Sequence, residues 1–194
     1  MQCFNRKNSY YEFNLEKRLI QLETNWSFVN DGEEKPDGFS FAGIAAGLKD
    51  SNKKDLALIL APENSICSGL FTQSIVRASC VDICEQRIKK SSGLIRAILI
   101  NSGQANACTG DYGIQHTLFA TKEVSQLLGI NEEEVLMCST GVIGIPIQIK
   151  NLIDNLPNLV KELKINSLQN AAEAILTTDS VSYTHLTLPT ILRV

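Results

Sequence analysis

Two short segments rich in glycine, serine, threonine and asparagine constrain the fold of this chain most strongly. They are residues 101–110 (NSGQANACTG) and 139–144 (STGVIG), and they follow apolar runs that predict buried strands over 95–100 (IRAILI) and 135–138 (VLMC). A helical pattern follows each segment. Strand, glycine-rich loop and helix therefore occur twice, which predicts a layered α/β protein with its chemistry at the strand ends. Bare amides and small hydroxyls there suit an anion or a polarised carbonyl, as in acyl transfer.

The rest of the chain predicts three helices and several more strands. Apolar residues recur at helical spacing over 111–128, with Gly129 as the end of that helix. Pro146 marks the start of a second helix, and a third is expected over 168–176. Upstream, a hairpin of two strands is expected within 55–72, and a further strand around 75–84. The stretch GFSFAGIAAGLK predicts a close-packed strand or loop near a site.

Composition excludes several classes of protein. The 194 residues are 44% hydrophobic with a net charge of -3, which is typical of a globular protein and disfavours nucleic acid as a partner. No apolar run approaches the roughly 18 to 20 residues of a membrane span. The six cysteines are scattered without a CxxC pair and without a secretory leader. We interpret them as reduced thiols of a cytoplasmic protein and expect no metal site.

The two ends differ in character from the rest. Residues 1–24 are polar and aromatic without a clear period, and we expect a poorly defined extension before a globular part over 25–180. Residues 181–194 lose the pattern and open with VSYTHL, which resembles a translated sequencing adapter. We expect this tail to be non-native, with the coding sequence ending near Ser180, which removes His185 from any catalytic role.

Five stretches, in the same order along the chain, carry a family resemblance: GFSFAGIAAGLK, KKDLALIL, IRAILINSGQANACTGDYG, EEVLMCSTGVIGIPI and AAEAILTTDS. They resemble the ornithine acetyltransferase family, the bifunctional glutamate N-acetyltransferase and amino-acid acetyltransferase of arginine biosynthesis. The resemblance runs from about Trp26 to Ser180. It implies a layered α/β sandwich, shared with a family of self-processing aminopeptidases, and a site of the N-terminal-nucleophile type.

The resemblance also implies a reaction. The family moves an acetyl group from N-acetylornithine to glutamate without a cofactor, and bifunctional members also take it from acetyl-CoA. The family precursor cleaves itself, and the freed N-terminal threonine of the second chain is the nucleophile. No stretch here matches that threonine motif. The chain therefore resembles an incomplete first subunit, inactive alone, of an α2β2 heterotetramer.

Three residues match functional positions of the family. Thr140 and Gly141 match the oxyanion hole, and Thr177 matches a substrate-binding position, with Thr178 as the alternative if the alignment shifts by one. From the residues alone, Thr140 and Gly141 are more simply a tight turn with Gly141 at positive φ and a cap for the next helix. Thr-Thr-Asp is likewise a common exit from a helix.

Other polar residues receive structural roles. Gln104 stands where the family usually has asparagine and keeps the amide group. Cys108 has no histidine assignable as its base, so we expect a buried structural thiol. His116 lies off the densest apolar stripe of its helix, which predicts an edge histidine. Two other functions stay open: a self-processing aminopeptidase of the same fold, and a non-catalytic module whose glycine-rich loops hold an anion.

Overall fold

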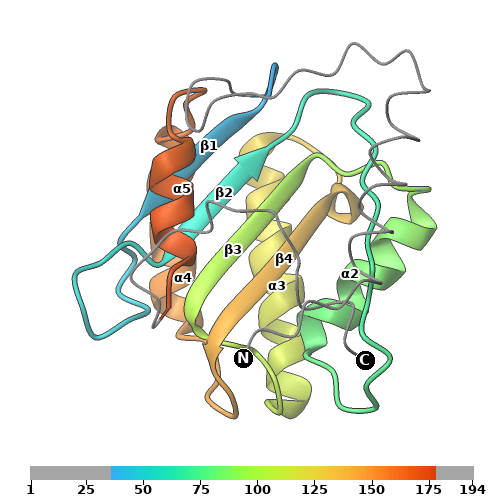
Figure 1. The fold of residues 1–194 in the computed structure, drawn as a ribbon, viewed down its shortest axis with the longest axis vertical. Coiled ribbons are helices and arrows are strands. Elements are labelled where there is room, and N and C mark those ends of the chain that lie inside the picture. Colours follow the sequence, from blue (N-terminus) through green and yellow to red (C-terminus); the bar gives the residue numbers. More distant parts are fainter. Residues whose placement is uncertain (1–35, 178–194) are drawn as a thin grey trace, which may run out of the picture. The chain divides into compact units, whose positions relative to one another are not determined.

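The computed structural model describes residues 36–177. A four-stranded sheet in the order β1-β2-β3-β4 forms its centre (Figure 1). The first three strands pair antiparallel, whereas β3 and β4 pair parallel. The strands are β1 (Ser40–Ile44), β2 (Leu56–Leu60), β3 (Ala97–Gln104) and β4 (Val135–Val142). The expectations for residues 1–24 and 178–194, including Thr178, His185 and the tail, lie outside the described residues.

Helices cover both faces of the sheet and one of its edges. Helix α5 packs over β1 and β2 on one face, α3 and α4 cover the other face, and α2 lies along β4 (Figure 1). The helices are α2 (Ser79–Lys90), α3 (Gly110–Leu128), α4 (Ile149–Lys161) and α5 (Leu168–Ile175), with a single 3₁₀ turn, η1 (Glu132–Glu134), before β4. This arrangement is the layered α/β architecture that the sequence predicts.

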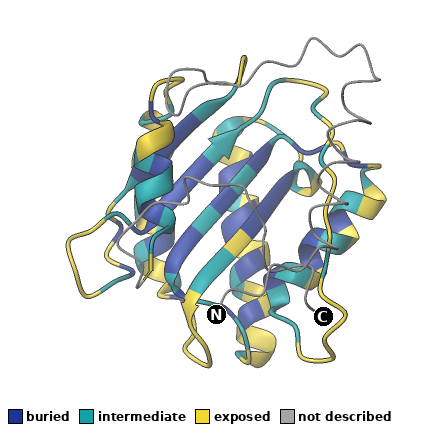
Figure 2. Ribbon diagram, in the orientation of Figure 1, coloured by how far each residue is buried: buried dark blue, intermediate teal, exposed yellow. Residues whose placement is uncertain are grey.

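The main hydrophobic core lies between the sheet and the helices α3 and α4. Figure 2 shows the buried residues running along the strands. The larger members of this core are Leu56, Leu58, Leu99, Val124, Val135, Met137, Leu152, Leu156 and Leu159. A smaller core lies beneath α5, where Gly43 of β1 meets the helix backbone. A Cβ atom on Gly43 would stand 2.0 Å from the carbonyl oxygen of Asn170, so only glycine permits this contact. The GFSFAGIAAGLK stretch is therefore close-packed, as expected.

Several expected elements are confirmed. Helix α3 begins one residue before its predicted start and ends at Gly129, which adopts the left-handed conformation with φ 67°. Helix α5 ends within one residue of its predicted end. The strands expected over 95–100 and 135–138 are neighbours, so the two glycine-rich segments meet at one end of the sheet.

Other expectations are wrong. Residues 79–84 begin helix α2 instead of forming a strand, because Cys80, Ile83, Cys84 and Arg87 recur at helical spacing on one buried face. Residues 66–72 form no strand. Both sides of β2, the expected hairpin partner, are taken by β1 and β3, and an isolated bridge joins Ile66 to Leu94. Helix α4 begins at Ile149, three residues after Pro146. Finally, β3 and β4 continue to Gln104 and Val142, so the first residues of each expected loop are strand.

Candidate active site

The ends of β3 and β4 pair residue by residue around two glycines. Ser102 stands opposite Thr140, and Gly103 stands opposite Gly141. The two glycines have φ values of 119° and 131°, which side chains rarely tolerate. A Cβ atom on Gly141 would lie 2.4 Å from the carbonyl carbon and oxygen of Gly103. The predicted positive φ at Gly141 is thus present, but it lies within a parallel ladder and not in a tight turn.

The direction of the backbone groups of Gly141 follows from the ladder. The amide of Ala105 donates to the carbonyl of Val142 over 2.9 Å, so the polar backbone groups of Val142 face β3. Successive residues of a strand direct these groups to opposite sides. By this alternation we expect the backbone groups of Gly141 to face the other edge of β4. Within residues 36–177 that edge pairs with no further strand.

Helix α2 covers this edge of β4 up to Ser139. Three of its side chains, about one helical turn apart, form hydrogen bonds with alternate residues of β4. Arg87 contacts Val135, Cys84 contacts Met137, and Cys80 contacts Ser139. Arg87 donates to the carbonyl of Val135 over 2.6 Å, and the Cys84 thiol donates to that of Met137 over 3.3 Å. Burial raises the pKa of the Cys80 and Cys84 thiols. They consequently stay protonated and can act as donors.

Gly141 is the next residue along the same edge, and α2 does not reach it. The helix begins at Ser79, one residue before Cys80, which already lies against Ser139. Gly141 is exposed, whereas Ser139 and Thr140 are half-buried. We therefore expect its amide to lie beyond the helix, at a part of the edge that no helix or strand of residues 36–177 covers. A backbone amide in such a position can donate to an oxyanion.

Thr140 shares a face of the sheet with α5. Opposite residues of a parallel pair direct their side chains to the same face, and Thr140 stands opposite Ser102. The Ser102 hydroxyl donates to the carbonyl of Ala174 in α5 over 2.5 Å. The Thr140 side chain is thus on the α5 face, next to the segment that leads to Thr177.

Thr177 lies at the same end of the sheet. It follows α5 and is exposed, and the carbonyl of its neighbour Leu176 accepts a hydrogen bond of 2.5 Å from the Lys49 ammonium. Lys49 in turn lies beside Gly103. Burial lowers the pKa of Lys49, while the carboxylate of Asp55 opposes that shift. The structure therefore brings all three predicted site residues to one end of β3 and β4.

A buried carboxylate supports this end of the sheet. Asp55 is fully buried and accepts hydrogen bonds from three backbone amides, at distances of 2.6, 2.7 and 3.0 Å. The donors are Ala46, Leu48 and Lys49. The side-chain amide of Gln104 donates a hydrogen bond of 2.6 Å to the carbonyl of Leu48. This is the amide group that Gln104 shares with the asparagine usual in the family. The sequence assigned no role to Asp55 or Lys49, although both lie in stretches that carry the family resemblance.

The loop after β3 holds two residues with unusual backbone conformations. Asn106 is buried with φ 53° and donates to the carbonyl of Gly113 and to the hydroxyl of Thr117. Cys108 has φ 58° and is exposed. The expectation of a buried Cys108 is wrong, because the anchored turn directs that residue to solvent. His116 is half-buried, as expected of an edge histidine, and burial lowers its pKa.

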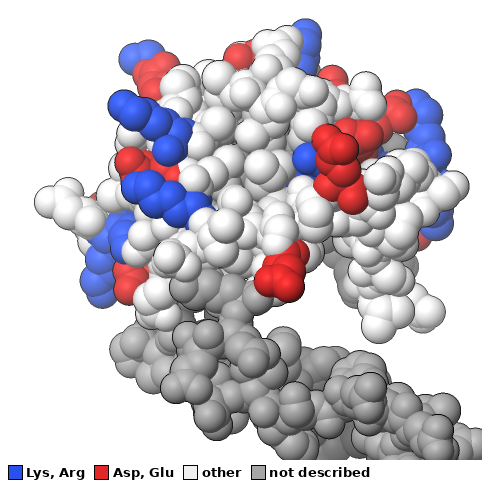
Figure 3. Space-filling view, turned by 90° about the horizontal axis from the view of Figure 1, so that it is seen from above, with Lys and Arg blue, Asp and Glu red and all other residues white. Residues whose placement is uncertain are grey.

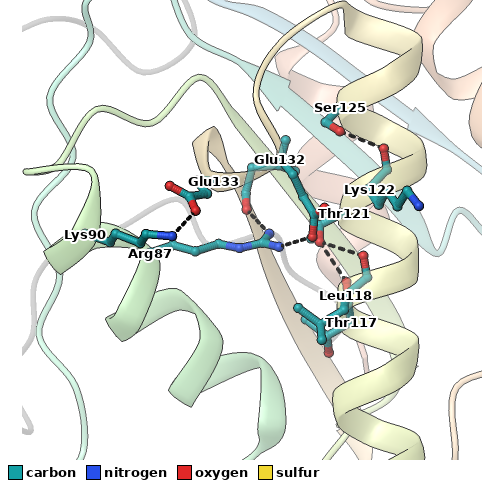
Figure 4. A network of polar contacts seen from close by, with 10 residues as sticks. Arg87, Lys90, Thr117, Leu118, Thr121, Lys122, Ser125, Glu132 and Glu133 are labelled. Atoms are coloured by element: carbon teal, nitrogen blue, oxygen red, sulfur yellow. Dashed lines mark hydrogen bonds and ion pairs between the residues drawn. The ribbon is translucent and has the colours of Figure 1, made fainter.

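Figure 4 shows a polar network between α2 and η1, beside α3. Arg87 reaches η1, where its guanidinium pairs with Glu132 over 2.7 Å, and Lys90 pairs with Glu133. A cleft of about 600 Å³ lies between α2, α3 and η1, lined by Arg87 but by none of the three predicted site residues. We assign the network to the attachment of α2, because Arg87 also holds the β4 edge.

Three further observations concern metal ions, membranes and surface charge. Among residues 36–177, no group of three histidine, cysteine or acidic residues is placed to hold a metal ion. No helix in that range has the length and apolar character needed to cross a bilayer. On the face seen in Figure 3, Lys and Arg lie close to Asp and Glu, mostly around the periphery, without an extended patch of one sign.

Comparison with known protein families identifies the family to which this chain belongs. The family model described as "ArgJ family" matches residues 40–189, which include every strand and helix of the described structure. The chain belongs to the ArgJ family. The matched range also extends past Ser180 into the residues expected to be a foreign tail.

Curated relatives carry the same family name. The arginine biosynthesis bifunctional protein ArgJ of Prochlorococcus marinus subsp. pastoris is 97% identical over 153 residues, which are 79% of this chain and 38% of that protein. The ArgJ protein of Parasynechococcus marenigrum is 51% identical over 161 residues, covering 83% of this chain and 39% of that protein. The chain thus spans well under half the length of these ArgJ relatives.

Two solved ArgJ structures share the fold. The crystal structure of ornithine acetyltransferase complexed with ornithine, from Mycobacterium tuberculosis, superposes with a TM-score of 0.71 at 36% identity, covering 75% of this chain and 79% of that one. The bifunctional ArgJ protein of Bacillus halodurans gives a TM-score of 0.70 at 31% identity, covering 75% of each chain. The sheet and its helices are therefore the ArgJ fold.

Proposed function

We propose that this chain supplies the oxyanion-stabilising part of an acetyltransferase that moves an acetyl group from N-acetylornithine to glutamate. The observation that carries the proposal is the position of Gly141 on the β4 edge, one step beyond the last residue that α2 covers. When a nucleophile attacks an acetyl carbonyl, negative charge develops on its oxygen. A donor held in place for that charge contributes about 3 to 4 kcal/mol.

Thr140 supplies the second donor of the oxyanion hole. Its side chain lies on the α5 face, directly before the Gly141 amide in the chain. The hydroxyl and the amide are therefore adjacent donors on one rigid strand, and a strand holds catalytic geometry better than a flexible loop. Such donors accelerate the reaction to the extent that they interact more strongly with the transition state than with the substrate.

The remaining catalytic groups come from a second chain. Its N-terminal threonine attacks the acetyl carbonyl of N-acetylornithine, so that ornithine leaves and an acetyl-threonine forms. The amino group of glutamate then attacks this ester, which releases N-acetylglutamate and restores the threonine. Thr177 binds the substrate from this chain, held in position by the contact of Lys49 with Leu176. In a bifunctional enzyme, acetyl-CoA serves as an additional donor, and two copies of each chain form the α2β2 assembly.

Two observations support this assignment. The superposed Mycobacterium tuberculosis protein is described as an ornithine acetyltransferase complexed with ornithine. The family match covers β3, β4 and α5, the elements that carry Thr140, Gly141 and Thr177. An enzyme of amino-acid biosynthesis acts on metabolites of the cytoplasm, and we assign the protein to that compartment.

Reconstitution tests the proposal. The chain is purified alone, and also co-expressed with the remaining part of the Prochlorococcus ArgJ relative. Both samples are then assayed for ornithine release from N-acetylornithine and glutamate. We expect background release from the chain alone and sustained turnover from the pair. Turnover by the chain alone would reveal a nucleophile within it, and an assembled but inactive pair would contradict the proposed reaction.

A further inference from the structure

Residues 65–76 form an irregular segment alongside α2, with an unusual distribution of apolar side chains (Figure 1). Cys67 and Phe71 point inward and pack beside Ile88 of α2. Four large apolar side chains of the segment point to solvent instead, and they are defined here as the apolar strip: Ile66, Leu70, Ile75 and Val76. Their exposed fractions are 70, 104, 101 and 68%, respectively. Figure 2 shows this exposure along the coil that precedes α2.

The composition of the segment strengthens the observation. Residues 65–76 (SICSGLFTQSIV) include no charged side chain. Scattered exposed apolar residues are common on protein surfaces, whereas several large ones on one short uncharged segment mark a contact surface. Leu94, which bridges to Ile66, is 42% exposed and extends the strip.

One end of the apolar strip leads to the candidate active site. It ends two residues before Ala78, the residue that precedes α2, and α2 in turn meets β4 at Ser139. On the other side of Gly141, the side chains of Val142, Ile143 and Ile145 are 55, 65 and 50% exposed. The start of α2 therefore links the end of the strip at Val76 to Ser139, and further exposed apolar side chains follow Gly141 in the chain.

We infer that the apolar strip is the docking surface for the part of the ArgJ polypeptide outside this chain. The chain matches 38% of the length of the Prochlorococcus relative, so most of that polypeptide is available to cover it. The inference rests on the proposed function, because there a threonine from a second chain must reach the Gly141 amide. Aromatic and aliphatic side chains that interlock with Leu70 and Ile75 are the expected complement.

The test uses the co-expressed pair, with an affinity tag on the second chain only. The double variant Leu70→Ser/Ile75→Ser should reduce the amount of this chain that co-purifies by at least tenfold. Phe119→Ser is the matched control, since Phe119 is 47% exposed on α3, which covers the other face of the sheet. It should co-purify like the unmodified chain. The urea unfolding midpoint of the double variant should agree with that of the unmodified chain, because Leu70 and Ile75 are fully exposed.

The possible outcomes separate this inference from the proposed function. An active pair in which the double variant co-purifies normally would overturn the docking surface alone. A pair that assembles through the strip but transfers no acetyl group would overturn the proposed function alone. Sedimentation of the chain by itself tests whether a second copy of this chain covers the strip instead. A dimer that the double variant abolishes would show this, contrary to the inference. Equal loss in the Phe119 variant would also count against it.

Discussion

The carbonyl of Gly103 occupies the space that a side chain on Gly141 would need, with its carbon and oxygen 2.4 Å from the ideal Cβ position. The two residues stand opposite each other in a parallel ladder, and both have positive φ. This contact fixes the separation of β3 and β4 where the candidate oxyanion donors lie. Any change at either glycine acts on the site through the backbone.

Gly141→Ala tests this contact. Alanine would combine an unfavourable φ with the clash against Gly103, so we expect a loss of unfolding free energy of at least about 2 kcal/mol. Gly144→Ala is the matched control, because Gly144 has φ 81° but open space around it. Its cost should be about 1 kcal/mol, from backbone conformation alone. Urea unfolding of the two variants measures the difference, and equal costs would show that the clash relaxes freely.

Thr140→Ala tests the oxyanion hole in the reconstituted pair. Loss of one donor for the developing charge should lower kcat roughly 100-fold, with KM changed by less than about threefold. Thr140→Ser keeps the hydroxyl and should retain most of the activity. Steady-state kinetics with N-acetylornithine as the varied substrate give both constants. A rise in KM with unchanged kcat would instead assign Thr140 to ground-state binding.

Lys49→Met tests how Thr177 is positioned. The Lys49 ammonium donates to the carbonyls of Leu176 and Lys54, so the variant should lose about 1 to 2 kcal/mol of unfolding free energy. It should also raise KM more than it lowers kcat. Lys49→Arg should recover part of the KM effect, since it keeps the charge and the donors. Lys53→Met, at an exposed lysine, is the control and should change neither constant. A pure fall in kcat would contradict a positioning role.

Arg87→Met tests the attachment of α2 to the β4 edge. The substitution leaves Glu132 unpaired and removes the donor to the buried carbonyl of Val135. Because Glu132 is partly exposed, we expect a loss of about 2 kcal/mol, between the values for surface and for buried pairs. Lys90→Met removes the exposed partner of Glu133 and should cost less than about 1 kcal/mol. Thermal or urea unfolding distinguishes the two variants. Equal losses would mean that the Arg87–Glu132 pair contributes no more than an ordinary surface ion pair.

Local patterns predicted the elements that depend on local interactions. Helix α3 follows from the spacing of its apolar residues and from Gly129, since both act within a few residues. The parallel neighbours β3 and β4 were identified by their apolar runs. Their ends were not, because the polar residues after Ile100 and Cys138 stay extended only through their pairing with each other across the sheet. A long-range contact of this kind leaves no local signal.

The errors upstream have a similar origin. Residues 66–72 have the β-branched and aromatic composition of a strand, but β2, the strand expected to pair with them in a hairpin, is already flanked by β1 and β3. The strand expected around 75–84 includes the first half of α2, which is apolar, whereas the charged second half of that helix includes the buried Arg87. The candidate site residues came from the family resemblance. Nothing in the local sequence identified Lys49, Ser102 or Asp55, whose partners lie in distant segments or in backbone amides.

Asp55 has a consequence for how the site responds to its surroundings. Its carboxylate is fully buried and is held by three backbone amides rather than by a cation at the surface. Dissolved salt screens exposed ion pairs strongly and buried contacts much less. The segment that carries Lys49 should therefore keep its shape across a wide range of ionic strength. At high salt concentration the surface ion pairs of α2 would weaken first, while the hydrogen bonds of Asp55 to the segment beside Gly103 would persist.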